Sequence, residues 1–276
     1  MSDIRQEATI TVPVDPSNPG EFLACCGLLE LAHRLTAPDC RALGWFSRPE
    51  GKDGKFSISA FEEGAPITLE RVLDSLGQCR IKEENSDSKE GPVFLEEPFN
   101  LTLDWRSPFP QNGKIKTFAG PQRLFDVFQT LQQAVQTVGK AELSDTPLFG
   151  IFKKTLMNVT AFGVEKAENA IDAGFSFDKH KEGKMRLVRR TPIFLEILAL
   201  IGAQRFCPGE FQKLERFYFS WYVPLAAPLA AIVSSTPFET LPQEGFVFQM
   251  YKRDPEGRYK GFSPARKLKT TKGGHR

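Results

Sequence analysis

Residues 17–35, SNPGEFLACCGLLELAHRL, are the best-specified helix that the sequence predicts. Asn18 is a suitable N-cap, and Pro19 favours the first helical turn. Glu21 stands three residues after the cap, where its carboxylate can reach back to the N–H of Asn18. Every residue from Phe22 to Leu29 is apolar or small, so the helix needs cover on most of its sides. We therefore expect it to be the central helix of the N-terminal half.

Small residues form a flat patch within this helix. Ala24, Cys25, Cys26 and Gly27 follow one another, and another backbone could lie closely on them. An isolated surface helix would show a broader polar face than the one that Glu30, His33 and Arg34 provide.

The rest of the chain mixes the periodicities of strands and helices. Alternating or aromatic runs predict strands or extended segments at Ala8–Val14, Leu43–Phe46, Lys55–Ala60, Phe99–Trp105, Phe175–Phe177, Arg186–Val188 and Phe217–Val223, and a hairpin of Gly245–Arg253 with Arg258–Phe262. Helical spacing or composition predicts helices at Ile67–Leu76, Arg123–Val138, Pro147–Met157, Ile193–Phe206 and Ala226–Val233. The mixture predicts an α+β fold, in which a mixed α/β half precedes a helix-rich half with a C-terminal β-hairpin and a basic tail.

The spacing of Pro, Gly and charged residues predicts how the chain is divided. We expect an N-terminal α+β domain at residues 1–112, a helix-rich domain with the hairpin at 113–262, and a flexible basic tail at 263–276. The segment RSPFPQNGKIKTFAGP, residues 106–121, is the candidate hinge. Ile81–Gly91 is predicted to be a charged loop.

Composition indicates a globular protein of the cytoplasm. The hydrophobic fraction is 41% and the charged fraction 25%, both ordinary for such a protein. No apolar run approaches the roughly 20 residues that cross a bilayer, so we expect no membrane partner. The N-terminus MSDIRQEAT lacks the basic and then apolar run of a signal peptide. Five cysteines without regular spacing favour reduced thiols.

Motifs for chemistry are sparse in this sequence. There is no GxxxxGK[ST] and no GxGxxG after a predicted strand. His33 stands seven residues from both Cys26 and Cys40, without the paired CxxC or HxxxH spacing of zinc sites. Cys25 and Cys26 suit packing better than nucleophilic catalysis. We therefore expect no catalytic residues, no metal and no cofactor, and a protein that is not an enzyme.

Basic residues are the informative ones. The stretch 50–97 carries 12 acidic and 6 basic residues, whereas 252–276 carries nine Lys or Arg against two acidic residues. Such local clusters suggest contact with a polyanion, in which Arg gives forked phosphate contacts and Lys a mobile point charge. The candidate nucleic-acid-binding residues are Lys179, Lys181, Lys184, Arg186, Arg189 and Arg190, then Lys114, Lys116 and Arg123, then Arg266, Lys267 and Lys269. Phe109, Phe118 and Tyr259 could stack on bases, although each could equally pack in a core.

Four segments together resemble a known protein family. They are NPGEFLACCGLLELAHRL at 18–35, LDWR at 103–106 with KIKTFAGPQ at 114–122, residues 174–208 with RRTPIFLEILALIGAQRFCP, and FYFSWYVPL at 217–225. In this order they resemble a short family encoded with type I-G (formerly I-U) CRISPR systems. That family is regarded as the large-subunit-like part of the crRNA-guided surveillance complex, Cascade. Phe118 and Pro121 stand where the family tends to have Trp and Gln, and the C-terminal basic tail lies outside the resemblance.

The resemblance implies a non-catalytic subunit of an antiviral ribonucleoprotein. Its partners would be crRNA, target DNA with the PAM-proximal duplex, other Cascade backbone and crRNA-end subunits, and a separate helicase-nuclease recruited on target binding. Because the guide reads the target by base pairing, such a subunit needs mainly phosphate contacts. Two alternatives remain open: an assembly subunit that touches only proteins, and a nuclease or metal-dependent enzyme of unrecognised type. A stoichiometric metal ion in the purified protein would direct attention to Cys25, Cys26, His33 and Cys40.

Overall fold

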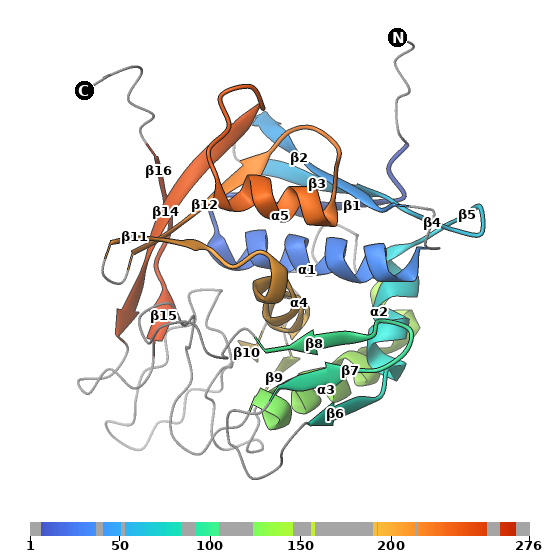
Figure 1. Ribbon diagram of the computed structural model, residues 1–276. Helices are drawn as coiled ribbons and strands as arrows, with labels where there is room; N and C mark the ends of the chain where they lie inside the picture. Colours follow the sequence, from blue (N-terminus) through green and yellow to red (C-terminus); the bar gives the residue numbers. More distant parts are fainter. Residues whose placement is uncertain are drawn as a thin grey trace, which may run out of the picture.

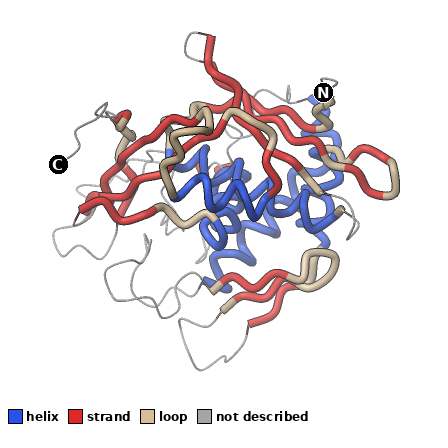
Figure 2. Tube along the Cα trace, turned by 45° about the horizontal axis from the view of Figure 1, so that its top comes forward, coloured by secondary structure: helices blue, strands red, loops and turns tan. Residues whose placement is uncertain are grey.

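The computed structural model describes most of the chain. The described residues are 7–36, 41–50, 53–83, 92–104, 124–145, 156–157, 190–191, 193–212, 215–252 and 260–268. In these residues helices occupy the middle of the molecule, with strands above and below them (Figures 1 and 2). The predicted α+β class is confirmed.

Five helices are described, and each contains part of a segment that the sequence predicts to be helical. They are α1 (Pro19–Leu35), α2 (Leu69–Gln78), α3 (Leu124–Asp145), α4 (Ile193–Arg205) and α5 (Ala227–Ser235). The α2 helix is capped by Thr68, whose hydroxyl accepts a hydrogen bond from the N–H of Arg71 at 3.2 Å. The α3 helix runs to Asp145, seven residues beyond the expected end.

Two larger antiparallel sheets build the upper part of the molecule. The first has the order β1-β3-β2-β13, and the second has the order β11-β12-β14-β15 with β16 also paired to β14. Their strands are β1 (Ile10–Val14), β2 (Leu43–Glu50), β3 (Asp53–Ser59), β13 (Leu225–Ala226), β11 (Gly209–Gln212), β12 (Glu215–Trp221), β14 (Gln243–Lys252), β15 (Lys260–Phe262) and β16 (Arg266–Lys267). The predicted C-terminal hairpin is confirmed, because Met250 of β14 lies opposite Phe262 of β15.

Smaller sheets complete the described strands. The order β6-β7-β8 joins β6 (Ile81–Glu83), β7 (Val93–Leu95) and β8 (Leu101–Leu103), next to α2 and α3 in Figure 1. Two-stranded pairs are β4 (Phe61–Glu62) with β5 (Ala65–Pro66), and β9 (Leu156–Met157) with β10 (Arg190–Thr191). The side-chain amide of Gln132 on α3 donates hydrogen bonds to the carbonyls of Leu76 and Cys79, at 2.8 and 2.6 Å. These bonds hold the C-terminal end of α2 against α3.

The cap of α1 differs in one detail from the predicted one. Asn18 does accept hydrogen bonds from the N–H groups of Gly20 and Glu21. The Glu21 carboxylate does not reach the N–H of Asn18. It accepts instead from the N–H of Asp15 at 2.7 Å, while the N–H of Asn18 donates to the carbonyl of Asp15. The tight turn before the helix therefore takes the place of the reciprocal capping box.

The α1 and α4 helices pack against each other in the core (Figure 1). The small patch of α1 allows this contact, since a methyl group at Gly27 would lie 1.9 Å from the carbonyl oxygen of Leu198. The predicted domain boundary after residue 112 lies outside the described residues. Elements from both sides of that boundary share this core.

An aromatic cluster joins the two larger sheets over α1. The ring of Phe22 stacks on Tyr218 with centroids 4.1 Å apart, and Trp221 meets Phe46 edge-on at 5.1 Å. Both polar groups of the β12 aromatics have partners. The Tyr218 hydroxyl donates to the carbonyl of Pro16 at 2.9 Å, and the Trp221 indole N–H donates to Gly44 at 2.7 Å.

Three local predictions are wrong. Residues 81–83 of the expected charged loop form β6, which pairs with β7. Residues 156–157 end a segment predicted to be helical, yet they form β9 opposite β10. Residues 266–267, expected in a flexible tail, form β16 on β14. The Leu268 N–H extends that pairing to the carbonyl of Gly245. In each case pairing with a distant strand outweighs the local sequence.

Candidate nucleic-acid interface

One edge of the second sheet gathers basic residues. β15 and β16 follow one another along the edge of β14 opposite β12, β15 at residues 250–252 and β16 at residues 246–247. This pairing brings together four cationic residues, which we call the basic edge: Lys252, Lys260, Arg266 and Lys267. Lys252 and Lys260 are direct cross-strand partners.

Arg266 is exposed but has a carboxylate partner on the far side of β14. Its Nη2 lies 3.5 Å from Glu215 Oε1, and its side chain is 62% exposed. The same Glu215 oxygen accepts a hydrogen bond from the amide of Gln249 at 3.2 Å. The guanidinium is thus oriented along the sheet while much of it faces solvent.

Lys267 is arranged in a similar way. Its Nζ lies 2.6 Å from Glu244 Oε1, and its side chain is 70% exposed. The other oxygen of Glu244 accepts a hydrogen bond from the hydroxyl of Tyr222 at 3.0 Å. The carboxylates of these pairs are less exposed than the cations, Glu215 at 13% and Glu244 at 27%. A phosphate that takes either cation would leave the carboxylate with its other donor, Gln249 or Tyr222.

The other predicted binding residues are not brought to this edge by any described contact. Arg190 lies in β10, where its backbone pairs with Met157. Lys114, Lys116, Arg123, Lys179, Lys181, Lys184, Arg186, Arg189 and Lys269 lie outside the described residues, as do Phe109, Phe118, Tyr259 and the candidate hinge at 106–121.

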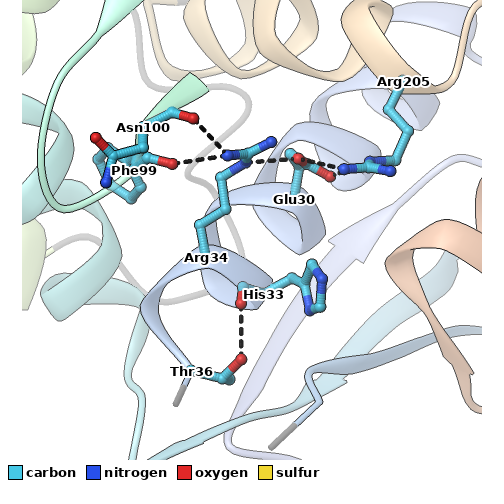
Figure 3. A network of polar contacts seen from close by, with 7 residues as sticks. All are labelled: Glu30, His33, Arg34, Thr36, Phe99, Asn100 and Arg205. Atoms are coloured by element: carbon cyan, nitrogen blue, oxygen red, sulfur yellow. Dashed lines mark hydrogen bonds and ion pairs between the residues drawn. The ribbon is translucent and has the colours of Figure 1, made fainter. Parts of the chain in front are cut away.

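A second polar cluster surrounds Glu30, which is fully buried. Figure 3 shows its carboxylate between two guanidinium groups. Arg34 Nε donates to it at 2.7 Å, and Arg205 donates through Nε at 2.5 Å and through Nη2 at 3.0 Å. Arg34 also donates to the carbonyls of Phe99 and Asn100. The cluster therefore joins α1, α4 and the turn before β8.

The charges around Glu30 favour a structural role for this cluster rather than a role in proton transfer. Burial alone would raise the pKa of Glu30, but the hydrogen bonds and charges of Arg205 and Arg34 hold that pKa below its usual value. Burial lowers the pKa of the neighbouring His33; Glu30 opposes this, and Arg205 and Arg34 reinforce it. Glu30 is thus a paired anion at neutral pH, and His33 is neutral.

The buried thiols are poor nucleophiles and poor metal ligands. Burial raises the pKa of Cys25 and Cys26 well above the usual thiol value, and that of Cys79 to about 11. Within the described ranges, no three His, Cys, Asp or Glu side chains are grouped so that they could hold a metal ion. Cys40, part of the open enzyme alternative, lies outside those ranges.

Comparisons with protein-family models, curated proteins and solved structures find no match to this chain. In the part of the chain that the structure describes, no helix is both long enough and apolar enough to cross a membrane.

Two features of the site were missed in the sequence. Glu30 and Arg205 are 175 positions apart, and no local pattern links them. The second feature is the ring of Phe217, which lies over Gly209 on the neighbouring strand. The sequence ERFYFSW, residues 215–221, could have indicated this ring, because its aromatic residues fall on both faces of the strand.

Proposed function

We propose that this chain is a non-catalytic, nucleic-acid-binding subunit of a crRNA-guided type I-G CRISPR effector complex in the cytoplasm. It would contact crRNA or the target DNA near the PAM, next to other Cascade subunits, before a separate helicase-nuclease is recruited for antiviral defence. The four sequence segments that resemble the short type I-G family support the assignment to this complex.

The basic edge is the observation that carries the nucleic-acid part of the proposal. Arg266 and Lys267 follow one another along this strand edge, and both remain exposed beside the carboxylates of Glu215 and Glu244. A phosphate backbone along this edge could accept charge-assisted hydrogen bonds from both cations. Such contacts position a nucleic acid without reading its sequence.

The first test measures binding of the purified full chain to a short DNA duplex and a single strand by fluorescence anisotropy. Binding should weaken steeply between about 50 and 200 mM salt. Arg266→Gln together with Lys267→Gln should reduce the slope of log affinity against log salt by about 1.8 for the duplex, or about 0.9 per lost contact.

A matched control is present on the same chain. Arg71 and Lys82 are also exposed cations that pair with carboxylates, Glu62 and Glu96, and they lie on other elements. Arg71→Gln with Lys82→Gln removes the same charge and should leave the slope unchanged. Equal slopes for both double variants and the parent would reject the basic edge as the interface.

The basic stretch 179–190, of which only Arg190 is among the described residues, is tested in the assembled complex. Reversing Arg186, Arg189 and Arg190 to Glu should abolish target binding while the complex still forms, because the change replaces phosphate attraction with repulsion. Unchanged target affinity would exclude that stretch as a binding site.

An assembly subunit that touches only proteins is the second candidate, and α5 favours it. Leu229 and Ile232 on this uncharged helix are 51% and 54% exposed, and Phe238 just beyond it is 36% exposed. Exposed apolar groups of this kind are common at protein interfaces. A chain that binds neither duplex nor single strand at low salt, but loses complex assembly on Leu229→Ser with Ile232→Ser, would fit this candidate instead.

A further inference from the structure

One row of the second sheet combines a half-buried ring, a buried branched apolar residue and an exposed guanidinium. Phe217 of β12 lies opposite Val247 of β14, and Val247 lies opposite Arg266 of β16. Residues in direct cross-strand register share one face of a sheet. The three side chains therefore form one row, on the side of the molecule where β11, β12, β14 and β16 lie together in Figure 1.

Glycine opposite Phe217 decides how its ring lies. Phe217 pairs with Gly209 of β11, and a methyl group at Gly209 would come 2.4 Å from the ring atom Cζ. The ring thus occupies the space above the glycine backbone. The Phe217 side chain is half-buried. Its ring lies against Gly209 of β11 and meets the ring of Phe219 edge-on, with centroids 5.8 Å apart. Because the Phe217 ring is already held in place, binding a ligand to it would cost little further side-chain entropy.

A second aromatic ring stands at the edge strand. Phe211 is the extra residue of the bulge in β11, between the paired residues Glu210 and Gln212, and it is 45% exposed. Bulges re-aim a side chain at the rim of a sheet.

The polar groups beside Phe217 are of the kinds that can contact the base and the phosphate of a nucleotide. The amide of Gln249 and the guanidinium of Arg266 both contact Glu215, so the two groups are held in place next to the ring. Gln249 is exposed, and Arg266 is 62% exposed. A guanidinium so placed can fork to a phosphate or stack on a base, and an amide can pair with a base edge.

We infer that Phe217, Phe211, Gln249 and Arg266 form a binding surface for single-stranded nucleic acid, on which unpaired bases stack. The inference rests on the proposed function and specifies the form of nucleic acid that this sheet takes. A duplex hides the faces of its bases and cannot stack on Phe217, whereas a single strand exposes every base. The basic edge then follows the phosphates of the same strand.

The test uses the full chain with a 12-nucleotide single strand carrying 2-aminopurine and with a duplex of equal phosphate number, each at two salt concentrations. The parent chain should bind the single strand more tightly and quench 2-aminopurine by stacking. Phe217→Leu keeps apolar bulk over Gly209, so it should weaken single-strand binding by about tenfold and abolish the quenching. Its salt slope should not change, because no phosphate contact is lost.

Two further variants make the result interpretable. Phe61→Leu is the matched control, since Phe61 is also an exposed phenylalanine at 39% and lies on the β4–β5 pair; it should bind as the parent does. Phe211→Leu alters a ring outside the core and tests the surface even if Phe217→Leu fails to fold, which circular dichroism would show. It should also reduce the quenching.

The outcomes separate this inference from the proposed function. Salt-dependent binding that is equal for duplex and single strand, with no quenching and no effect of Phe217→Leu or Phe211→Leu, overturns the aromatic surface and leaves the proposed function standing. Absence of binding to either nucleic acid at low salt overturns both.

Discussion

Gly202 of α4 lies directly against the backbone of α1 at Gly27. A methyl group on Gly202 would be 2.0 Å from the carbonyl oxygen of Leu23 and 2.8 Å from the N–H nitrogen of Gly27. Neither backbone can give way alone, because both helices are buried along most of their length. The spacing between the two helices is therefore set by these two glycines.

Gly202→Ala should destabilise the protein by about 2–3 kcal/mol, because the added methyl group forces two packed helices apart. The free energy of unfolding, from urea or guanidinium titration, checks this. Gly77→Ala on α2 is the control. A methyl group there would lie 3.3 Å from the side-chain Cγ of Gln136, which can shift, and alanine favours the helix by up to about 1 kcal/mol. Similar losses for both variants would contradict the account of the α1–α4 contact.

Glu30→Ala should cost about 3 kcal/mol of unfolding free energy, because it leaves the guanidinium groups of Arg34 and Arg205 without their shared anion. Both arginines are partly exposed, which places the loss at the lower end of the range for a broken buried pair. Glu62→Ala removes the partner of the exposed Arg71 and should change stability by less than about 1 kcal/mol. Equal losses would mean that the Glu30 cluster contributes no more than a surface pair.

Acid should destabilise the fold in two stages. The pKa of His33 is lowered from 6.5 in the folded state, so below about pH 6.5 the unfolded chain binds a proton that the folded chain resists. The pKa of Glu30 is lowered from 4.5, so its stabilisation is complete above that pH and is lost as the pH falls through the folded value. Unfolding free energies from pH 7 to pH 3 should therefore decline. In Glu30→Gln the decline below about pH 4.5 should be shallower, and an unchanged profile would contradict the assignment.

Alkylation should separate the described thiols. Cys207 is exposed, whereas Cys25, Cys26 and Cys79 are buried. Burial raises the pKa of all four thiols, so access of the reagent and not ionisation separates Cys207 from the other three. Iodoacetamide at pH 7.5, followed by peptide mass spectrometry, should label Cys207 in the native protein and the other three only after denaturation. Rapid native labelling of Cys25 or Cys26 would revive a reactive role for them.

Trp221→Phe should cost about 3 kcal/mol, because it removes the indole hydrogen bond to Gly44 and leaves space in the aromatic cluster. Trp45→Phe is the matched change at a partly buried tryptophan of β2 and should cost less. Denaturant titration of both variants measures the difference, and equal costs would contradict a special role for the Gly44 contact.

The sequence pattern was sufficient to predict an element whose cap and apolar residues all lie within that element. The cap at Asn18, the apolar run after it and the small patch at Gly27 predicted both the position of α1 and a close neighbour. They did not predict that the neighbour is α4, because nothing near Gly27 in sequence points to Gly202. The same limit applies to the pairing of Arg266 with Glu215 and of Glu30 with Arg205, which join residues from distant strands and helices.

The short strand β16 was also not predicted from the sequence. Residues 266–267 have exposed charged side chains and no alternation from which a strand could be predicted. They pair with β14 because Leu268 covers Gly245 and because both charges find carboxylates across the sheet. Arg266 and Lys267 were candidates from the sequence because of their charge, but their pairing along the edge of β14 was visible only in three dimensions.

The contact between α1 and α4 has a consequence for how the chain is made. Translation finishes α1 at Leu35 and reaches α4 only at Ile193, an interval on the order of 10–30 s at about 5–20 residues per second. During that interval α1 has neither α4 nor the β12 aromatics to cover it, although β1, β2 and β3 have already been translated. We expect the nascent N-terminal half to bind a ribosome-associated chaperone until the second half emerges.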